Sequence, residues 1–189
     1  MSTKTGRLPE LTEENLSAAQ RVVFDAIQSG PRGNMGLVGP FGVYVRAPGV
    51  GHAAQSMGAA VRFNTELAEN AKEVAICTVG AFYHSKFEFA AHATLAKKAG
   101  VADDIVESLR RGEVPNFSRD DERVAHEVAT QLLHDHRISD ATYARALAVL
   151  GETQTIEVVT TVGYYVLVSM TLNAFEIPLR EGMVDPFPE

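Results

Sequence analysis

Hydrophobic side chains recur every three or four residues along most of the chain, which is the spacing of amphipathic α-helices. The pattern predicts helices over about residues 12–29, 52–63, 65–83, 85–99, 102–111, 118–136, 139–150 and 152–175. Residues 158–162 are rich in β-branched side chains, but they lie inside the last helical pattern and do not alternate as a strand would. We therefore expect an all-α fold of about eight helices.

The helical pattern is bounded by one N-terminal arm and one C-terminal tail, so we expect a single domain over residues 1–189. The arm covers about residues 1–10, and the tail, with three prolines, covers about residues 176–189. Thr12, Ser118 and Ser139 are the predicted helix N-caps. Residues 30–51 are rich in glycine and proline without the spacing of a phosphate-binding loop, which predicts a structural loop. The alternatives are that this segment closes a pocket or meets a neighbouring subunit.

Composition narrows the class of protein. With 46% hydrophobic and 22% charged residues the chain is typical of a globular protein rather than a disordered one. A net charge of −7 argues against nonspecific binding to nucleic acid or to an anionic membrane. The first residues lack the apolar region of a secretory signal, and we interpret the most apolar stretch, residues 158–172, as a buried helix because polar residues interrupt it. We expect a soluble, cytoplasmic protein.

Several other residues are most simply interpreted as structural or solvent-exposed, without a role in chemistry. Cys77 is the only cysteine, so the chain can form neither an internal disulfide nor a dithiol pair, and its apolar neighbours predict a buried thiol. The last three histidines, at positions 126, 134 and 136, lie in a polar helical pattern and are expected to be solvated. Tyr164 and Tyr165 are expected in the core, with the alternative that one hydroxyl points into a pocket.

Candidate chemistry lies between residues 73 and 92. Glu88 and His92 are four residues apart and so share one helix face, with Ser85 near that face; Glu73 stands before an apolar run. Burial in apolar surroundings would raise the pKa of a glutamate toward the range useful for a general acid or base. The structural alternatives are a solvated Glu–His pair and a Glu73 that merely pairs with a lysine or arginine. Glu73 or His84 could join Glu88 and His92 around a metal ion, but the spacing matches no known metal motif, so we expect none.

The motif resembles that of the carboxymuconolactone decarboxylase family, which includes the alkylhydroperoxidase D-like proteins. The resemblance rests on Glu73, the segment Glu88-Phe89-Ala90-Ala91-His92, Gly100 and the segment from Ile105 to Gly112, and it is close over about residues 55–112. It implies an alkylhydroperoxidase D-like helical bundle that assembles as a trimer or hexamer and uses neither metal nor organic cofactor.

The resemblance also implies a reaction. The peroxidase branch carries a Cys-x-x-Cys pair where this chain has Ser85 and Glu88, so dithiol peroxidase chemistry is not expected. The decarboxylase branch resembles Glu…Glu-x-x-x-His, which this chain keeps as Glu73, Glu88 and His92. We thus expect a lyase that removes CO2 from a small carboxylated lactone of aromatic catabolism by acid–base chemistry. Alternatives are a lactone isomerase or hydrolase, a non-redox small-molecule-binding oligomer and, least favoured, a peroxidase that uses Cys77.

Candidate substrate-binding residues lie close to this motif. They are Arg46, Tyr83, His84, Ser85 and Lys86. Among them, the cationic or ionisable side chains of Arg46, His84 and Lys86 are the candidates for holding a substrate carboxylate.

Overall fold

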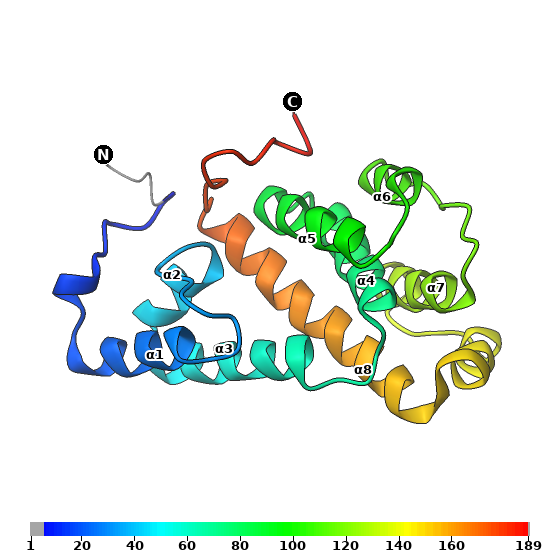
Figure 1. The fold of residues 1–189 in the computed structure, drawn as a ribbon, viewed down its shortest axis with the longest axis horizontal. Coiled ribbons are helices and arrows are strands. Elements are labelled where there is room, and N and C mark those ends of the chain that lie inside the picture. Colours follow the sequence, from blue (N-terminus) through cyan, green and yellow to red (C-terminus); the bar gives the residue numbers. More distant parts are fainter. Residues whose placement is uncertain (1–5, 189) are drawn as a thin grey trace.

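The computed structural model describes residues 6–188, and these residues form an all-α structure of eight α-helices without strands. The helices are α1 (Ala18–Gln28), α2 (Pro40–Arg46), α3 (Pro48–Phe63), α4 (Glu69–Phe82), α5 (Lys86–Lys98), α6 (Asp103–Arg110), α7 (Asp120–His134) and α8 (Asp140–Ala174), preceded by a short 3₁₀ turn, η1 (Glu13–Asn15). Helices α1–α3 lie on one side of the second half of α8 and α4–α7 lie on the other (Figure 1). The predicted all-α class is confirmed.

The helix boundaries follow local sequence signals in most places. Ser139 accepts a hydrogen bond from the backbone N–H of Thr142 and caps α8 as predicted. Two other caps were predicted wrongly. Thr12 caps only η1, while Ser17 caps α1, and Arg119 rather than Ser118 occupies the N-cap position of α7.

The glycine-rich segment 30–51 is not a loop throughout, as the sequence predicted. Residues 40–46 form α2, and α3 already begins at Pro48. Each helix starts with a proline, whose fixed φ suits the first helical turn. Gly39, at the N-cap of α2, has φ +60°, a left-handed conformation that favours glycine.

Helix α4 is the central element of the core. All its residues from Asn70 to Ala81 are buried, and it packs against α5, α7 and α8. This burial agrees with the sequence, in which apolar positions cover most of the circumference of this helix. As a result, any ionisable side chain on α4 has to find its partner inside the protein.

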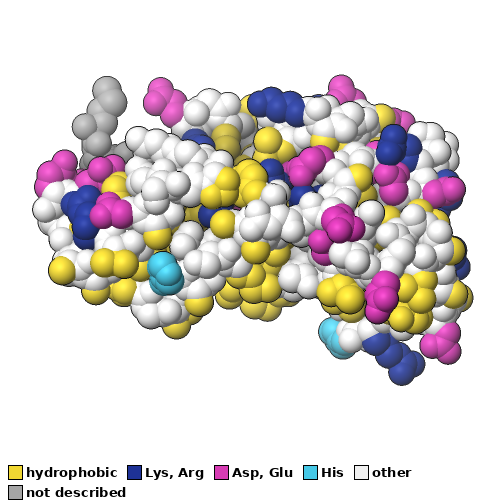
Figure 2. Space-filling model, turned by 60° about the horizontal axis from the view of Figure 1, so that its bottom comes forward, with side chains coloured by type: hydrophobic (Ala, Val, Ile, Leu, Met, Phe, Trp, Pro, Cys, Tyr) yellow, Lys and Arg dark blue, Asp and Glu magenta, His cyan; other side chains and the backbone are white. Residues whose placement is uncertain are grey.

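Helix α8 was predicted as two helices, and its backbone agrees with that prediction. Gly151 has φ +76° and interrupts the helical conformation between the two halves. By length and composition α8 could cross a membrane, but one such helix is weak evidence of a membrane span, and half of its most apolar window is buried in this protein. In the space-filling view, hydrophobic patches come to the surface between scattered acidic and basic side chains (Figure 2).

Candidate active site

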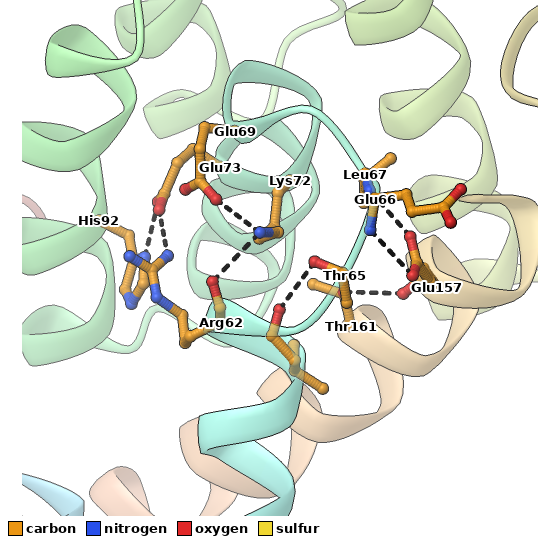
Figure 3. Close-up of polar contacts among 11 residues, drawn as sticks. Arg62, Thr65, Glu66, Leu67, Glu69, Lys72, Glu73, His92, Glu157 and Thr161 are labelled. Carbon is orange, nitrogen blue, oxygen red and sulfur yellow. Dashed lines mark hydrogen bonds and ion pairs between the residues drawn. The ribbon is translucent and has the colours of Figure 1, made fainter. Parts of the chain in front are cut away.

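Glu73 on α4 is the centre of a buried ionic cluster. Its side chain is 1% exposed, and its two carboxylate oxygens contact cationic side chains from two different helices. Nδ1 of His92 on α5 lies 2.6 Å from Oε2, and Nη1 of Arg62 on α3 donates to Oε1. Figure 3 shows both cations pointing at this one carboxylate. The structure thus brings together two of the predicted site residues and adds Arg62.

The connection between α3 and α4 is held by polar contacts that fix the position of Arg62. The backbone N–H groups of Glu66 and Leu67 donate to the Glu157 carboxylate of α8, at 3.0 and 2.8 Å. Nζ of the buried Lys72 donates to the carbonyl of Arg62 at 3.3 Å and lies 2.6 Å from Oε1 of Glu69 (Figure 3). These bonds tie the end of α3 to both α4 and α8, so the guanidinium is presented to Glu73 in a fixed direction.

Glu88 faces the other nitrogen of His92. Its Oε1 lies 3.0 Å from Nε2, as the spacing of four residues on α5 predicted. Among the described residues this oxygen has no hydrogen bond of good geometry, although it is buried. The Tyr165 ring meets the imidazole edge-on, with 5.0 Å between the ring centres. One buried imidazole therefore lies between two buried carboxylates.

The cluster determines which groups are charged. Burial alone would lower the pKa of His92, but Glu73 and Glu88 raise it to about 9, so the ring is an imidazolium at neutral pH. Burial would likewise raise the pKa of Glu73, but His92 and Arg62 outweigh it and hold the pKa below its usual value. The expectation that apolar surroundings raise a glutamate pKa is therefore wrong for Glu73, because a cation from another helix reaches it.

A cavity of about 780 Å³ opens beside the cluster. His92 and Glu88 line it, whereas Glu73 lies behind His92 and does not. Its aromatic walls come from Phe41, Phe63, Phe87, Phe89, Tyr164 and Tyr165, and its cations include Arg32, Arg62 and Arg180. Such a mixture of apolar wall and a few cations suits a small anionic ring compound.

The predicted substrate-binding residues near the motif lie outside this cavity. Ser85 is fully buried at the N-cap position of α5, where its hydroxyl makes no capping bond. Lys86 pairs with Asp185 at 2.6 Å. His84 adopts a left-handed conformation with φ +46°, and its ring stacks on Phe187.

The other two candidates also have structural contacts away from the cavity. The Tyr83 carbonyl accepts from Asn173 Nδ2 at 2.7 Å, and Arg46 Nη2 donates to the carbonyl of Pro9 at 2.6 Å. None of the five predicted substrate-binding residues lines the cavity around His92. Lys97 on α5 lines it too, but Arg32, Arg62 and Arg180 were missed because they come from segments far away in the sequence.

Glycine 58 on α3 explains how part of the cavity wall can form. A Cβ at this position would overlap the hydroxyl of Tyr164 and approach Nη2 of Arg32 at 2.6 Å. The absence of a side chain therefore lets α8 and the segment before α2 meet over α3. Both tyrosines are buried, as predicted, and both also line the cavity, which was the alternative. The glycine-rich segment contributes Arg32, Pro40 and Phe41 to the wall, in agreement with its pocket-closing alternative.

Other expectations have mixed outcomes. Cys77 is buried as predicted, and burial, with Glu73 and Glu88 nearby, raises the pKa of its thiol well above the usual value. His126 is buried, so its predicted solvation is wrong; burial lowers its pKa. Over residues 6–188, no three His, Cys, Asp or Glu side chains are placed to hold a metal ion.

Comparison with known proteins adds no assignment. No protein-family model matches the chain, and no curated protein matches it in sequence. The resemblance to the carboxymuconolactone decarboxylase family therefore stays a prediction from the motif.

Proposed function

We propose that this protein is a cofactor-free carboxy-lyase of the carboxymuconolactone decarboxylase type. It acts in the cytoplasm on a small carboxylated lactone or a related intermediate of aromatic catabolism. The observation that carries the proposal is the His92 imidazolium held between Glu73 and Glu88 at the wall of a cavity with cationic side chains.

The proposed reaction needs one proton at one carbon atom. The bond between the ring carbon and the leaving carboxylate breaks, CO2 departs, and the electron pair remains as a dienolate conjugated with the lactone carbonyl. The proton on His92 Nε2, which lies 3.0 Å from Glu88 Oε1, then moves to the dienolate carbon. A proton taken up from solvent through the cavity restores His92, so each turnover consumes one proton and releases one CO2. Arg32 and Arg62, which also line the cavity, stabilise the negative charge that develops on the dienolate.

The three motif residues have different parts in this scheme. His92 and Glu88 line the cavity; His92 carries the transferable proton and Glu88 favours the cationic form of the ring, so both are catalytic. Glu73 does not line the cavity. It accepts from Nδ1, orients the ring and favours the cationic form of His92, which makes it a positioning residue.

Release of CO2 from 4-carboxymuconolactone tests the proposal. Wild type is expected to release CO2 as the substrate absorbance falls. Glu88→Gln is expected to lower kcat by about 10²-fold or more, because the imidazolium loses the carboxylate that faces its Nε2 proton. Glu127→Gln, on the outer surface of α7 where Glu127 pairs with Arg145, is the matched control and should keep the wild-type rate.

The product decides between this reaction and its alternatives. Only decarboxylation lowers the mass of the product by that of CO2, whereas an isomerase leaves the mass unchanged and a hydrolase adds water. Equal rates for wild type and Glu88→Gln would remove Glu88 from the mechanism. Ligand-dependent thermal stabilisation without turnover would indicate a binding protein in place of an enzyme.

We also propose that the protein is a homo-oligomer, a trimer or hexamer. The support is a row of exposed small and apolar residues on the second half of α8, where Ile156, Val159, Gly163, Leu167 and Met170 recur with heptad-like spacing. Such a row is typical of a seam between two helices. Sedimentation velocity should give the mass of three or six chains, and Leu167→Glu should reduce it; a wild-type monomer would refute the proposal.

A further inference from the structure

The C-terminal tail forms part of the cavity wall. After α8 ends at Ala174, residues 177–187, here called the C-terminal strap, continue past the end of that helix toward α5 (Figure 1). Ile177 and Leu179 pack on the main core at its beginning, and Phe187 packs on Phe89 at its end. Two further contacts fix the end of the strap: the ion pair of Lys86 with Asp185, and a 2.9 Å hydrogen bond from Arg110 Nη1 to the Pro186 carbonyl.

Between these two attachments the strap faces the cavity. Arg180, Gly182, Met183, Val184 and Pro186 all line it. The middle of the strap is otherwise well exposed; Val184, for example, is 81% exposed. A segment that is held at both ends and exposed in the middle can move when a ligand enters without disturbing the helices.

Arg180 differs from Arg62 and Arg110 in its charge partners. It differs from Arg32, which also lines the cavity without an ion pair among the described residues, because Arg32 donates to the Gln55 carbonyl at 3.1 Å. Arg62 is paired with Glu73, and Arg110 with Glu107. Within residues 6–188 the guanidinium of Arg180 has no carboxylate within ion-pair distance and lies over the Phe87 ring, 5.4 Å from its centre. A guanidinium stacked on an aromatic ring keeps its planar donor edge available for a carboxylate.

We infer that Arg180 holds a carboxylate of the substrate, and that the C-terminal strap is the part of the site that recognises it. The inference rests on the proposed function and deepens it, since it requires a substrate with a second carboxylate. That carboxylate is the one the product retains. Strong pairing of the leaving carboxylate would stabilise the ground state and slow the loss of CO2, whereas pairing of the retained one binds substrate and transition state alike.

Kinetics of two substitutions test this role. Arg180→Gln is expected to raise KM for 4-carboxymuconolactone about 10- to 100-fold while kcat changes less than about threefold, because a charge-assisted pair present throughout the reaction is lost. Arg180→Lys should restore part of the affinity, since lysine keeps the positive charge but not the two parallel N–H donors of a guanidinium. Arg137→Gln, an exposed arginine in the turn before α8, is the control and should behave as wild type.

Binding of an unreactive dicarboxylate gives a readout that does not depend on turnover. Calorimetry with glutarate should show binding to wild type and Arg137→Gln, weakened at least about tenfold in Arg180→Gln, and no binding of dimethyl glutarate. Glutarate should also slow tryptic cleavage after Arg180, measured by intact mass. Loss of glutarate binding in Arg180→Gln would uphold the inference even if no CO2 is ever released. The inference would be overturned if wild type did not bind glutarate, or if glutarate affinity and KM were the same in all variants.

Discussion

Replacing His92 by glutamine is expected to lower kcat for CO2 release by about 10²- to 10⁴-fold, the range over which a positioned proton donor accelerates a reaction. Glutamine has similar size and can still donate to Glu73, but it cannot carry a transferable proton. The ring it replaces is an imidazolium held 2.6 Å from one carboxylate and 3.0 Å from another. The measurement is the rate of CO2 release at saturating substrate concentration.

The pH profile of wild type and a control variant should support the same interpretation of the lowered kcat. In wild type, kcat should fall as the pH rises through about 9, because His92 then loses its proton. His134→Gln, which replaces an exposed histidine on α7, should keep both the rate and the pH profile. A rate for His92→Gln near that of wild type would exclude the imidazole as proton donor.

Replacing Glu73 by glutamine is expected to have the largest effect on stability. The change leaves the half-buried Arg62 guanidinium and the buried His92 imidazolium without their shared anion. Breaking a buried ion pair on one side costs about 3–5 kcal/mol. Urea unfolding followed by far-ultraviolet circular dichroism gives the free energy of unfolding. Glu127→Gln, which removes one partner of a surface pair, should cost less than about 1 kcal/mol.

The same variant should change the pH dependence of stability. The pKa of His92 is raised from 6.5 to about 9 in the folded protein, so its contribution is fully present below 6.5 and is lost as the pH rises through 9. The loss is on the order of 3 kcal/mol. Glu73, with a lowered pKa, contributes above its usual pKa of 4.5 and loses that contribution as the pH falls.

In Glu73→Gln the decrease in stability between pH 6.5 and 9 should shrink, because one of the two carboxylates that raise the pKa of His92 is gone. An unchanged decrease would show that Glu73 does not set the charge of His92. Together with the kinetics of His92→Gln, this outcome separates the positioning role of Glu73 from the catalytic role of His92.

Local sequence determined the helices and one half of the site. The repeat of apolar residues predicted all-α structure, the burial of most of α4 and the break near Gly151. Because residues four apart on a helix face the same way, the pairing of Glu88 with His92 was also predictable. Helix α2 was not, since its seven residues follow a left-handed glycine inside a segment with the composition of a loop.

The tertiary structure alone decided what surrounds that pair. Arg62 reaches Glu73 from the end of α3, the Tyr165 ring closes on His92 from α8, and Arg180 arrives from the C-terminal strap. No periodicity within one helix reports contacts between segments so far apart. Their packing lowered a glutamate pKa that burial alone would have raised, and it placed the cavity away from Arg46, Tyr83, His84, Ser85 and Lys86. Sequence spacing fixes which side chains share a helix face, whereas charge state and access depend on which other helices that face meets.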